Sequence, residues 1–184
     1  MPKVSEAHRE QRRRQILEGA RRAFGATGYF GTTVALLEEA IGLSRGAIFS
    51  YYPSKLELFL ALASQDRRRI GDLWLEGGFE GLVRHVGDED PEWIGVYLEV
   101  GRMLRTDAGL RERWLSLAPE VDVEIADRYR ELQEQGEVRQ DVPFETMLRF
   151  LGVVFDGLVT QQGAGFPVDV EGTLLLVRSA LSPA

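Results

Sequence analysis

The sequence predicts an all-α fold, and three observations support this class. Apolar residues recur at spacings of three and four along most of the 184-residue chain. No segment keeps the period-two alternation of a half-buried strand, and Asn-Gly hairpin turns are absent because the chain contains no asparagine. The proportions of hydrophobic and charged residues, 44% and 28%, indicate a folded globular protein with at most two units.

Three helices are expected in the first third of the chain. An apolar stripe from Ile16 to Phe24 predicts a helix over residues 5–26, which Gly28 ends. Thr33 can cap a short helix over residues 34–40, and Gly42 supplies its left-handed stop. Ser44 then caps a second short helix over residues 44–50.

Six further helices are expected, which brings the total to nine. The Ser54-x-x-Glu57 capping box begins a long helix, and Asp90-Pro91 reads as an N-cap followed by proline at the first helical position. Pro119 falls inside one of these helices, where it predicts a kink. The six expected ranges are residues 54–77, 79–86, 91–105, 108–135, 143–159 and 169–181.

The charge is distributed unevenly along the chain. The net charge of the whole chain is −7, yet residues 1–55 hold nine Lys or Arg against five Asp or Glu, and the remainder holds 13 against 24. A basic module on an acidic body suits a protein that meets phosphates at one end. Chance clustering is the alternative on charge alone.

Several function classes are excluded or disfavoured. The chain has no cysteine, so disulfides, thiol catalysis and cysteine-bound metals are ruled out. His8 and His85 are far apart in sequence, and no nucleophile–base pair or metal-ligand spacing indicates an enzyme. The acids at positions 88–90 could attract a cation, but the N-cap interpretation is preferred. Lacking an apolar run of about 20 residues or a signal peptide, the protein is expected to be cytoplasmic and to contact no membrane.

The two short helices around Gly42 have the dimensions of a helix-turn-helix. Gly42 allows the sharp turn, and a small core of Leu37, Ile41, Leu43 and Ile48 would hold the second helix at a steep angle to the first. Many proteins turn between helices in this way, so the pair alone is a modest signal.

The flanking residues make the signal stronger. Residues 42–59, GLSRGAIFSYYPSKLELF, and the upstream residues 20–33, ARRAFGATGYFGTT, closely resemble the N-terminal domain of TetR-family transcriptional repressors. The resemblance implies a nine-helix homodimer with a DNA-binding domain over residues 1–53 and a ligand-binding and dimerisation domain over residues 54–184. It also implies repression at a palindromic operator and release by a small molecule, with the helix after Ser54 as the lever between the domains.

The resemblance assigns DNA contacts residue by residue. Thr33, Tyr51 and Lys55 are expected on phosphates, which position the module. Ser44 and Arg45 are expected at base edges, where Arg45 can pair with a guanine. The sequence departs from the family pattern at Glu38, Ala47 and Phe49. Gly46 and Ser50 complete the expected DNA contacts, with the Ser50 hydroxyl in place of the hydroxyls that Ala47 and Phe49 lack.

The last two helices are expected to form the dimer interface, because their apolar stripe exceeds what one small body needs to cover. The expected interface residues are Phe144, Leu148, Leu151, Phe155, Leu158, Leu174, Val177 and Leu181.

A second resemblance, to the aconitase repressors within this family, is carried by strings such as Leu-Phe-Leu-Ala-Leu-Ala63 and Leu-Arg-Thr-Asp107. It implies a carboxylate effector such as citrate with Mg²⁺, and no other cofactor. Arg102, Arg105 and Arg128, with Glu99 near a metal, are the expected ligand residues, although each arginine could instead form a solvated salt bridge. Two alternatives stay open: a regulator for a hydrophobic ligand, and a helical adaptor that binds only proteins.

Overall fold

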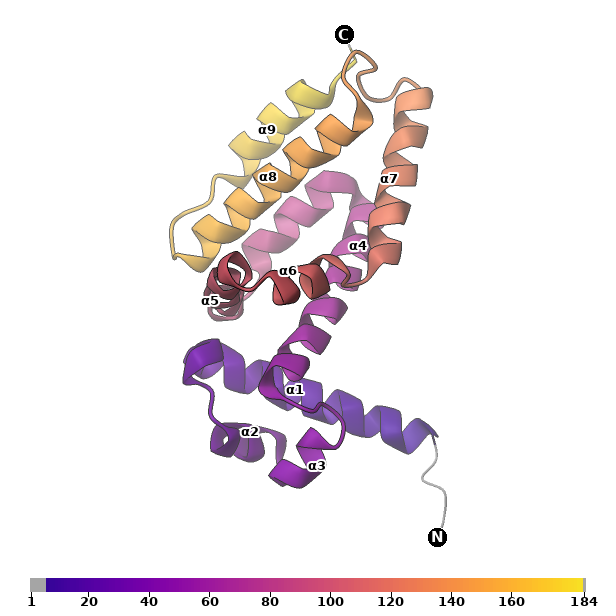
Figure 1. Ribbon diagram of the computed structural model, residues 1–184. Coiled ribbons are helices and arrows are strands. Elements are labelled where there is room, and N and C mark those ends of the chain that lie inside the picture. The colour runs from indigo at the N-terminus through magenta and orange to yellow at the C-terminus, as the bar shows by residue number, and fades with distance from the viewer. Residues whose placement is uncertain (1–5, 184) are drawn as a thin grey trace.

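A computed structural model describes residues 6–183, with only the backbone at residues 87 and 88, and confirms the all-α prediction for that part of the chain. The described helices are α1 (Glu6–Gly31), α2 (Val34–Ile41), α3 (Arg45–Phe49), α4 (Lys55–Asp88), α5 (Pro91–Thr106), α6 (Ala108–Leu115), α7 (Pro119–Glu134), α8 (Phe144–Gly163) and α9 (Val170–Leu181). In Figure 1, α1 to α3 form one end of the molecule and α5 to α9 form the body, with α4 running between them. In this part of the chain, no helix is both long and apolar enough for a membrane span.

The predicted helix starts are set by local caps. Thr33 Oγ1 accepts a hydrogen bond from Leu36 N at 3.3 Å, which fixes the start of α2. Ser54 Oγ accepts one from Glu57 N at 3.2 Å at the start of α4. Asp90 caps α5, in agreement with the interpretation preferred over a cation site. The side chain of residue 88 and the expected helix start at Ser5 lie outside what the structure describes.

One expected boundary inside a long helical range is confirmed, and another is wrong. The break expected near Gly77 is confirmed: Gly78 is non-helical (φ 62°, ψ −165°), and two helical segments meet there within the range of α4. The single helix expected over residues 108–135 is two helices, because Ala118 adopts φ 47° and Pro119 starts α7 instead of kinking one long helix.

The core that holds the N-terminal module extends past residue 53 into the body. Phe59 of α4 packs against Phe24 of α1, Trp93 of α5 and Trp114 of α6, with ring centroids 6.1–6.4 Å apart. A second core joins the remainder of α4 to α7, α8 and α9. The expectation that α4 alone connects the two parts is therefore wrong, since α5 packs directly on α1.

Candidate nucleic-acid interface and ligand cavity

The turn between α2 and α3 has the geometry that a helix-turn-helix needs. Gly42 adopts φ 75° and ψ 28°, a left-handed conformation that glycine enters without steric cost. Leu37 and Ile48 are fully buried, so they pin the two helices to α1 and α4. The short α3 is held by its buried side and leaves the opposite side open.

The open side of α3 carries the predicted base-reading residues. Ser44, Arg45, Gly46 and Ser50 are all exposed. Ser44 Oγ accepts a hydrogen bond from Ala47 N at 3.4 Å, and Ser50 Oγ donates one to the Ala47 carbonyl at 2.7 Å. Nothing lies within 4 Å of where a Gly46 Cβ would be, so a DNA backbone or base can approach closely there.

Glu38, which departs from the family pattern, has a structural role that the sequence did not reveal. Its Oε1 accepts a hydrogen bond from Arg45 N at 2.6 Å, so the carboxylate satisfies a free N–H in the first turn of α3. Glu38 therefore fixes α3 against α2 from the polar side, as Leu37 and Ile48 do from the apolar side.

Lys55, one of the predicted phosphate contacts, is half-buried and engaged inside the module. Its Nζ donates to the Tyr29 carbonyl at 2.7 Å and to the Thr32 carbonyl at 2.9 Å, and lies 4.6 Å from the centre of the Tyr29 ring. Burial lowers the pKa of Lys55 and the nearby Glu99 carboxylate opposes that change. Lys55 thus fastens the end of α1 to the start of α4, a role that sequence reasoning missed.

The other two predicted phosphate contacts lie at the edges of this surface. Thr33 is exposed at the start of α2, where its hydroxyl is already the N-cap acceptor. Tyr51 is half-buried against the first core just after α3. The structure therefore brings all the predicted DNA residues to one end of the molecule, around α3.

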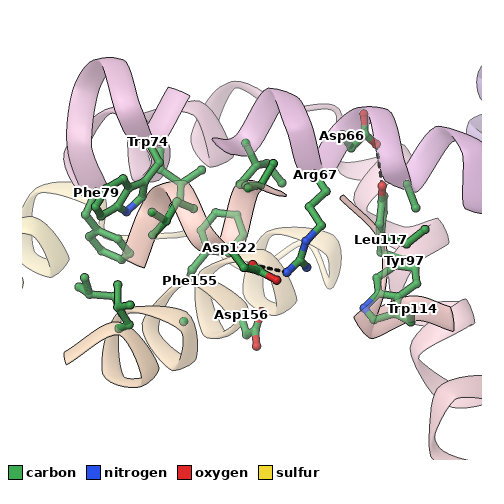
Figure 2. Close-up of a pocket in the computed structure, with 18 residues that line it drawn as sticks. Asp66, Arg67, Trp74, Phe79, Tyr97, Trp114, Leu117, Asp122, Phe155 and Asp156 are labelled. Atoms are coloured by element: carbon green, nitrogen blue, oxygen red, sulfur yellow. Dashed lines mark hydrogen bonds and ion pairs between the residues drawn. The ribbon is translucent and has the colours of Figure 1, made fainter. Parts of the chain in front are cut away.

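A cavity of about 470 Å³ lies in the body between α4, α5, α6, α7 and α8 (Figure 2). Its volume is in the range of small-molecule sites. Aromatic and aliphatic side chains dominate the wall, and four charged side chains interrupt it. The lining residues are Ala63, Asp66, Arg67, Ile70, Trp74, Phe79, Leu82, Tyr97, Trp114, Leu117, Val121, Asp122, Ile125, Leu148, Leu151, Gly152, Phe155 and Asp156.

Arg67 is the one cation on this wall. Its Nη2 donates to Asp122 Oδ1 at 2.5 Å, while its Nε is buried without a hydrogen-bond partner among the described residues. A buried donor without an acceptor is costly, so this atom favours an acceptor group on a bound molecule. Burial raises the pKa of Asp156, because the charged carboxylate loses hydration beside the apolar wall.

The predicted ligand residues do not meet at this cavity. Arg102, Arg105 and Arg128 are exposed, and Arg128 pairs with Glu131 at 3.3 Å on the surface of α7. Glu99 is on the side of α5 that faces α1, where its Oε2 accepts a hydrogen bond from Phe30 N at 3.0 Å. Spacing therefore placed these residues on two helices that line the cavity, α5 and α7, but the residues do not line it themselves, and their ligand role stays a prediction.

The predicted dimer residues pack largely within the protein itself, and their role between two copies stays a prediction. Leu151, Leu158, Leu174 and Val177 are buried in the protein's own second core, with Phe144 and Leu181 packed against it, and Leu148 and Phe155 line the cavity. The apolar residues that α8 and α9 leave exposed are different ones: Phe150 (42% exposed), Val153 (66%), Leu175 (67%) and Leu176 (71%). These four residues are called the outer face below.

A helix-turn-helix with an open second helix, joined to a helical body with an internal cavity, defines the class of helix-turn-helix DNA-binding regulators. Residues 16–62 match the model of the bacterial regulatory proteins of the tetR family. The chain is 38% identical to the HTH-type transcriptional repressor AcnR of Corynebacterium diphtheriae, covering 98% of this chain and 97% of that protein. It is 40% identical to the HTH-type transcriptional repressor Rv1474c of Mycobacterium tuberculosis, covering 98% of both. The chain therefore belongs to the TetR family of transcriptional regulators.

Solved structures share the fold. Salmonella enterica GusR superposes with a TM-score of 0.76 at 21% identity, covering 98% of this chain and 99% of that one. A cysteine-substituted CifR in complex with 26-bp operator DNA superposes with a TM-score of 0.65 at 22% identity, covering 91% of this chain and 93% of that one. At these identities the likeness concerns the architecture alone.

Proposed function

We propose that this protein is a homodimeric repressor that binds a palindromic operator through α3 and leaves it when a small molecule occupies the cavity. The open side of α3, with Arg45 exposed at its start, is the observation that supports this best. The relatives with the most complete coverage are named transcriptional repressors, which supports the same direction of control. An adaptor that binds only proteins would leave the basic module unexplained.

The outer face of α8 and α9 supports the dimer. Four large apolar side chains are exposed on these two neighbouring helices, and apolar surface that gathers in one place is typical of an interaction site. A second copy related by a two-fold axis would cover the same patch on both protomers. The dimer would then place two copies of α3 about 34 Å apart, one turn of B-DNA.

The cavity favours a largely apolar effector with one hydrogen-bond acceptor. Its aromatic wall suits such a molecule, and the unpartnered Arg67 Nε would receive the acceptor. Asp66, Asp122 and Asp156 also line the wall, so a trianion such as citrate would face three carboxylates and one guanidinium. The citrate–Mg²⁺ hypothesis stays a prediction, and no group of three or more acidic or His side chains in the described residues is arranged to hold a metal ion.

Arg45→Ala is expected to weaken binding to the operator by about 5- to 150-fold, which is the discrimination of one bidentate arginine–guanine contact, about 1–3 kcal/mol. Binding to random DNA should change little, because phosphate contacts supply it. Fluorescence anisotropy with the fragment upstream of the protein's own gene measures both. Arg102→Ala, at an exposed position of α5, is the matched control and should leave both affinities unchanged. Equal losses for Arg45→Ala on operator and random DNA would contradict base reading.

Arg67→Met should weaken effector-type binding at least tenfold while operator affinity stays within about threefold, since Arg67 is in the body and not near α3. The probe is 8-anilinonaphthalene-1-sulfonate, an apolar aromatic molecule with one anionic group, and its fluorescence titration should weaken at least tenfold. Calorimetry with citrate, with and without Mg²⁺, is the second arm. Citrate binding that is undiminished by Arg67→Met would place the effector site elsewhere and favour the polycarboxylate hypothesis.

A further inference from the structure

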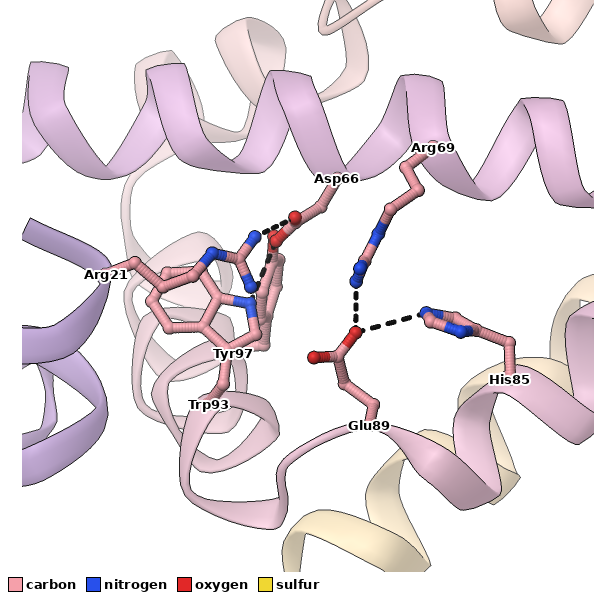
Figure 3. Close-up of polar contacts among 7 residues, drawn as sticks. All are labelled: Arg21, Asp66, Arg69, His85, Glu89, Trp93 and Tyr97. Carbon is pink, nitrogen blue, oxygen red and sulfur yellow. Dashed lines mark hydrogen bonds and ion pairs between the residues drawn. The ribbon is translucent and has the colours of Figure 1, made fainter. Parts of the chain in front are cut away.

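One buried carboxylate joins three helices across the boundary between module and body. Asp66 of α4 is only 7% exposed. Its Oδ1 accepts a hydrogen bond from Nη2 of Arg21 on α1. Its Oδ2 accepts from Trp93 Nε1 at 2.9 Å and from the Tyr97 hydroxyl at 2.7 Å, both on α5 (Figure 3).

This cluster is the partition between two hollows of the protein. Asp66 and Tyr97 line the 470 Å³ cavity of the body. Arg21 and Trp93 line a crevice of about 320 Å³ between α1 and the turn from α4 to α5. The Arg21 guanidinium carbon also lies 4.2 Å from the centre of the Trp93 ring. The Asp66 carboxylate therefore connects the cavity directly to Arg21 of α1.

The chemistry of the cluster makes its members interdependent. A carboxylate with so little exposure needs all its donors, and the loss of one changes the geometry of the others. Burial, with the Asp66 charge, raises the pKa of Tyr97 well above its usual value, so its hydroxyl stays a donor. Loss of the hydrogen bond from Tyr97 should therefore change the hydrogen bond between Arg21 and Asp66.

The neighbouring polar cluster lacks this connection. Glu89 accepts one hydrogen bond from Arg69 Nη2 and pairs with His85 Nε2 at 3.1 Å, as Figure 3 also shows. None of these three residues lines the cavity of the body. Of these two polar clusters, the Asp66 cluster is the one that connects the cavity to α1.

We propose that Asp66 couples the cavity to the DNA module: a molecule whose hydrogen-bond donor replaces the Tyr97 hydroxyl at Oδ2 draws Asp66 away from Arg21 and frees α1. With α1 free, α2 and α3 lose their fixed orientation to the body. The operator-competent arrangement then becomes a smaller part of the population, and the apparent affinity for DNA falls in proportion. This inference rests on the proposed effector-controlled repressor and adds the route of control and a donor group on the effector.

A double-mutant cycle tests the route without an effector. Tyr97→Phe removes only the hydroxyl on the cavity side, and Arg21→Gln removes the contact on the module side. Amide hydrogen exchange of residues 16–31 in the free protein and operator affinity by anisotropy are the two measurements. Phe79→Leu, a cavity-lining change away from Asp66, is the control.

Tyr97→Phe is expected to speed exchange in α1 about tenfold and to weaken operator binding about fivefold. Both effects should shrink to less than twofold when Arg21→Gln is present, whereas the effects of Phe79→Leu should be the same with and without it. Equal effects of Tyr97→Phe in both backgrounds, or none in either, would overturn the route. If Arg21→Gln does not fold, Arg21→Lys takes its place. Hydrogen exchange needs neither DNA nor effector, so failure of the coupling and failure of the repressor proposal give different results.

Discussion

Replacing Val153 and Leu176 together by glutamate should give monomers that bind operator DNA at least 100-fold more weakly than the unmodified protein. These side chains are 66% and 71% exposed on the outer face, so the change should not disturb the protein's own core. In the proposed dimer four carboxylates would be buried in an apolar interface, which is prohibitive without partners. Without the dimer each half-site is bound separately, and linking two half-sites contributes about 10²–10⁴ in affinity.

Light scattering gives the oligomeric state, and circular dichroism confirms that the double variant is folded. Val123→Glu is the matched control, since Val123 is 60% exposed on α7 and outside the outer face, so it should remain dimeric. A folded double variant that stays dimeric would show that the two copies meet through another surface.

Lys55→Met should lower the free energy of unfolding by about 3 kcal/mol. The substitution leaves the Tyr29 and Thr32 carbonyls without their charged donor, and hydrogen bonds to charged groups contribute about 1.5–3 kcal/mol each. The aliphatic part of the side chain is kept, so lost packing is a small part of the effect. Urea denaturation followed by circular dichroism measures the change.

Lys55→Arg separates the internal role from the predicted phosphate contact. Arginine keeps the charge for a phosphate but not the compact ammonium that reaches two carbonyls at once. We therefore expect the salt dependence of DNA binding of Lys55→Arg to lie close to that of the unmodified protein. Its free energy of unfolding should stay closer to that of Lys55→Met. If the free energy of unfolding of Lys55→Met lies within about 0.5 kcal/mol of that of the unmodified protein, the internal role of Lys55 is refuted and only the phosphate contact remains.

The parts of the fold predicted from the sequence are those determined by neighbouring residues. Thr33, Ser54 and Asp90 cap helices through N–H groups two or three positions ahead, so their patterns are readable in a short window. Gly42 likewise has the left-handed turn that its position requires. The irregular backbone at Gly78 was also predicted, but whether Pro119 bends one helix or starts a new one depends on what packs around it.

The parts of the candidate site that the sequence did not predict depend on tertiary contacts. Helix α8 is apolar on two sides, and periodicity alone does not tell that Leu151 faces the protein's own core and Val153 faces outward. Asp66 lies in an ordinary helical stretch, and its partners Arg21 and Tyr97 are far from it in sequence. Arg67 stood within a basic run, Arg67-Arg68-Arg69, with no signal that only the first lines the cavity.

In the proposed function, two copies of α3 bind one palindrome, and an occupied cavity ends this binding. Footprinting of the DNA upstream of the protein's own gene, with the dimer mass measured on the complex, tests it most directly. We expect a protected palindrome whose half-sites are about one helical turn apart, or a multiple of it, and which Arg45→Ala no longer protects. Protection without two-fold symmetry, or protection that Arg45→Ala leaves intact, would contradict the account.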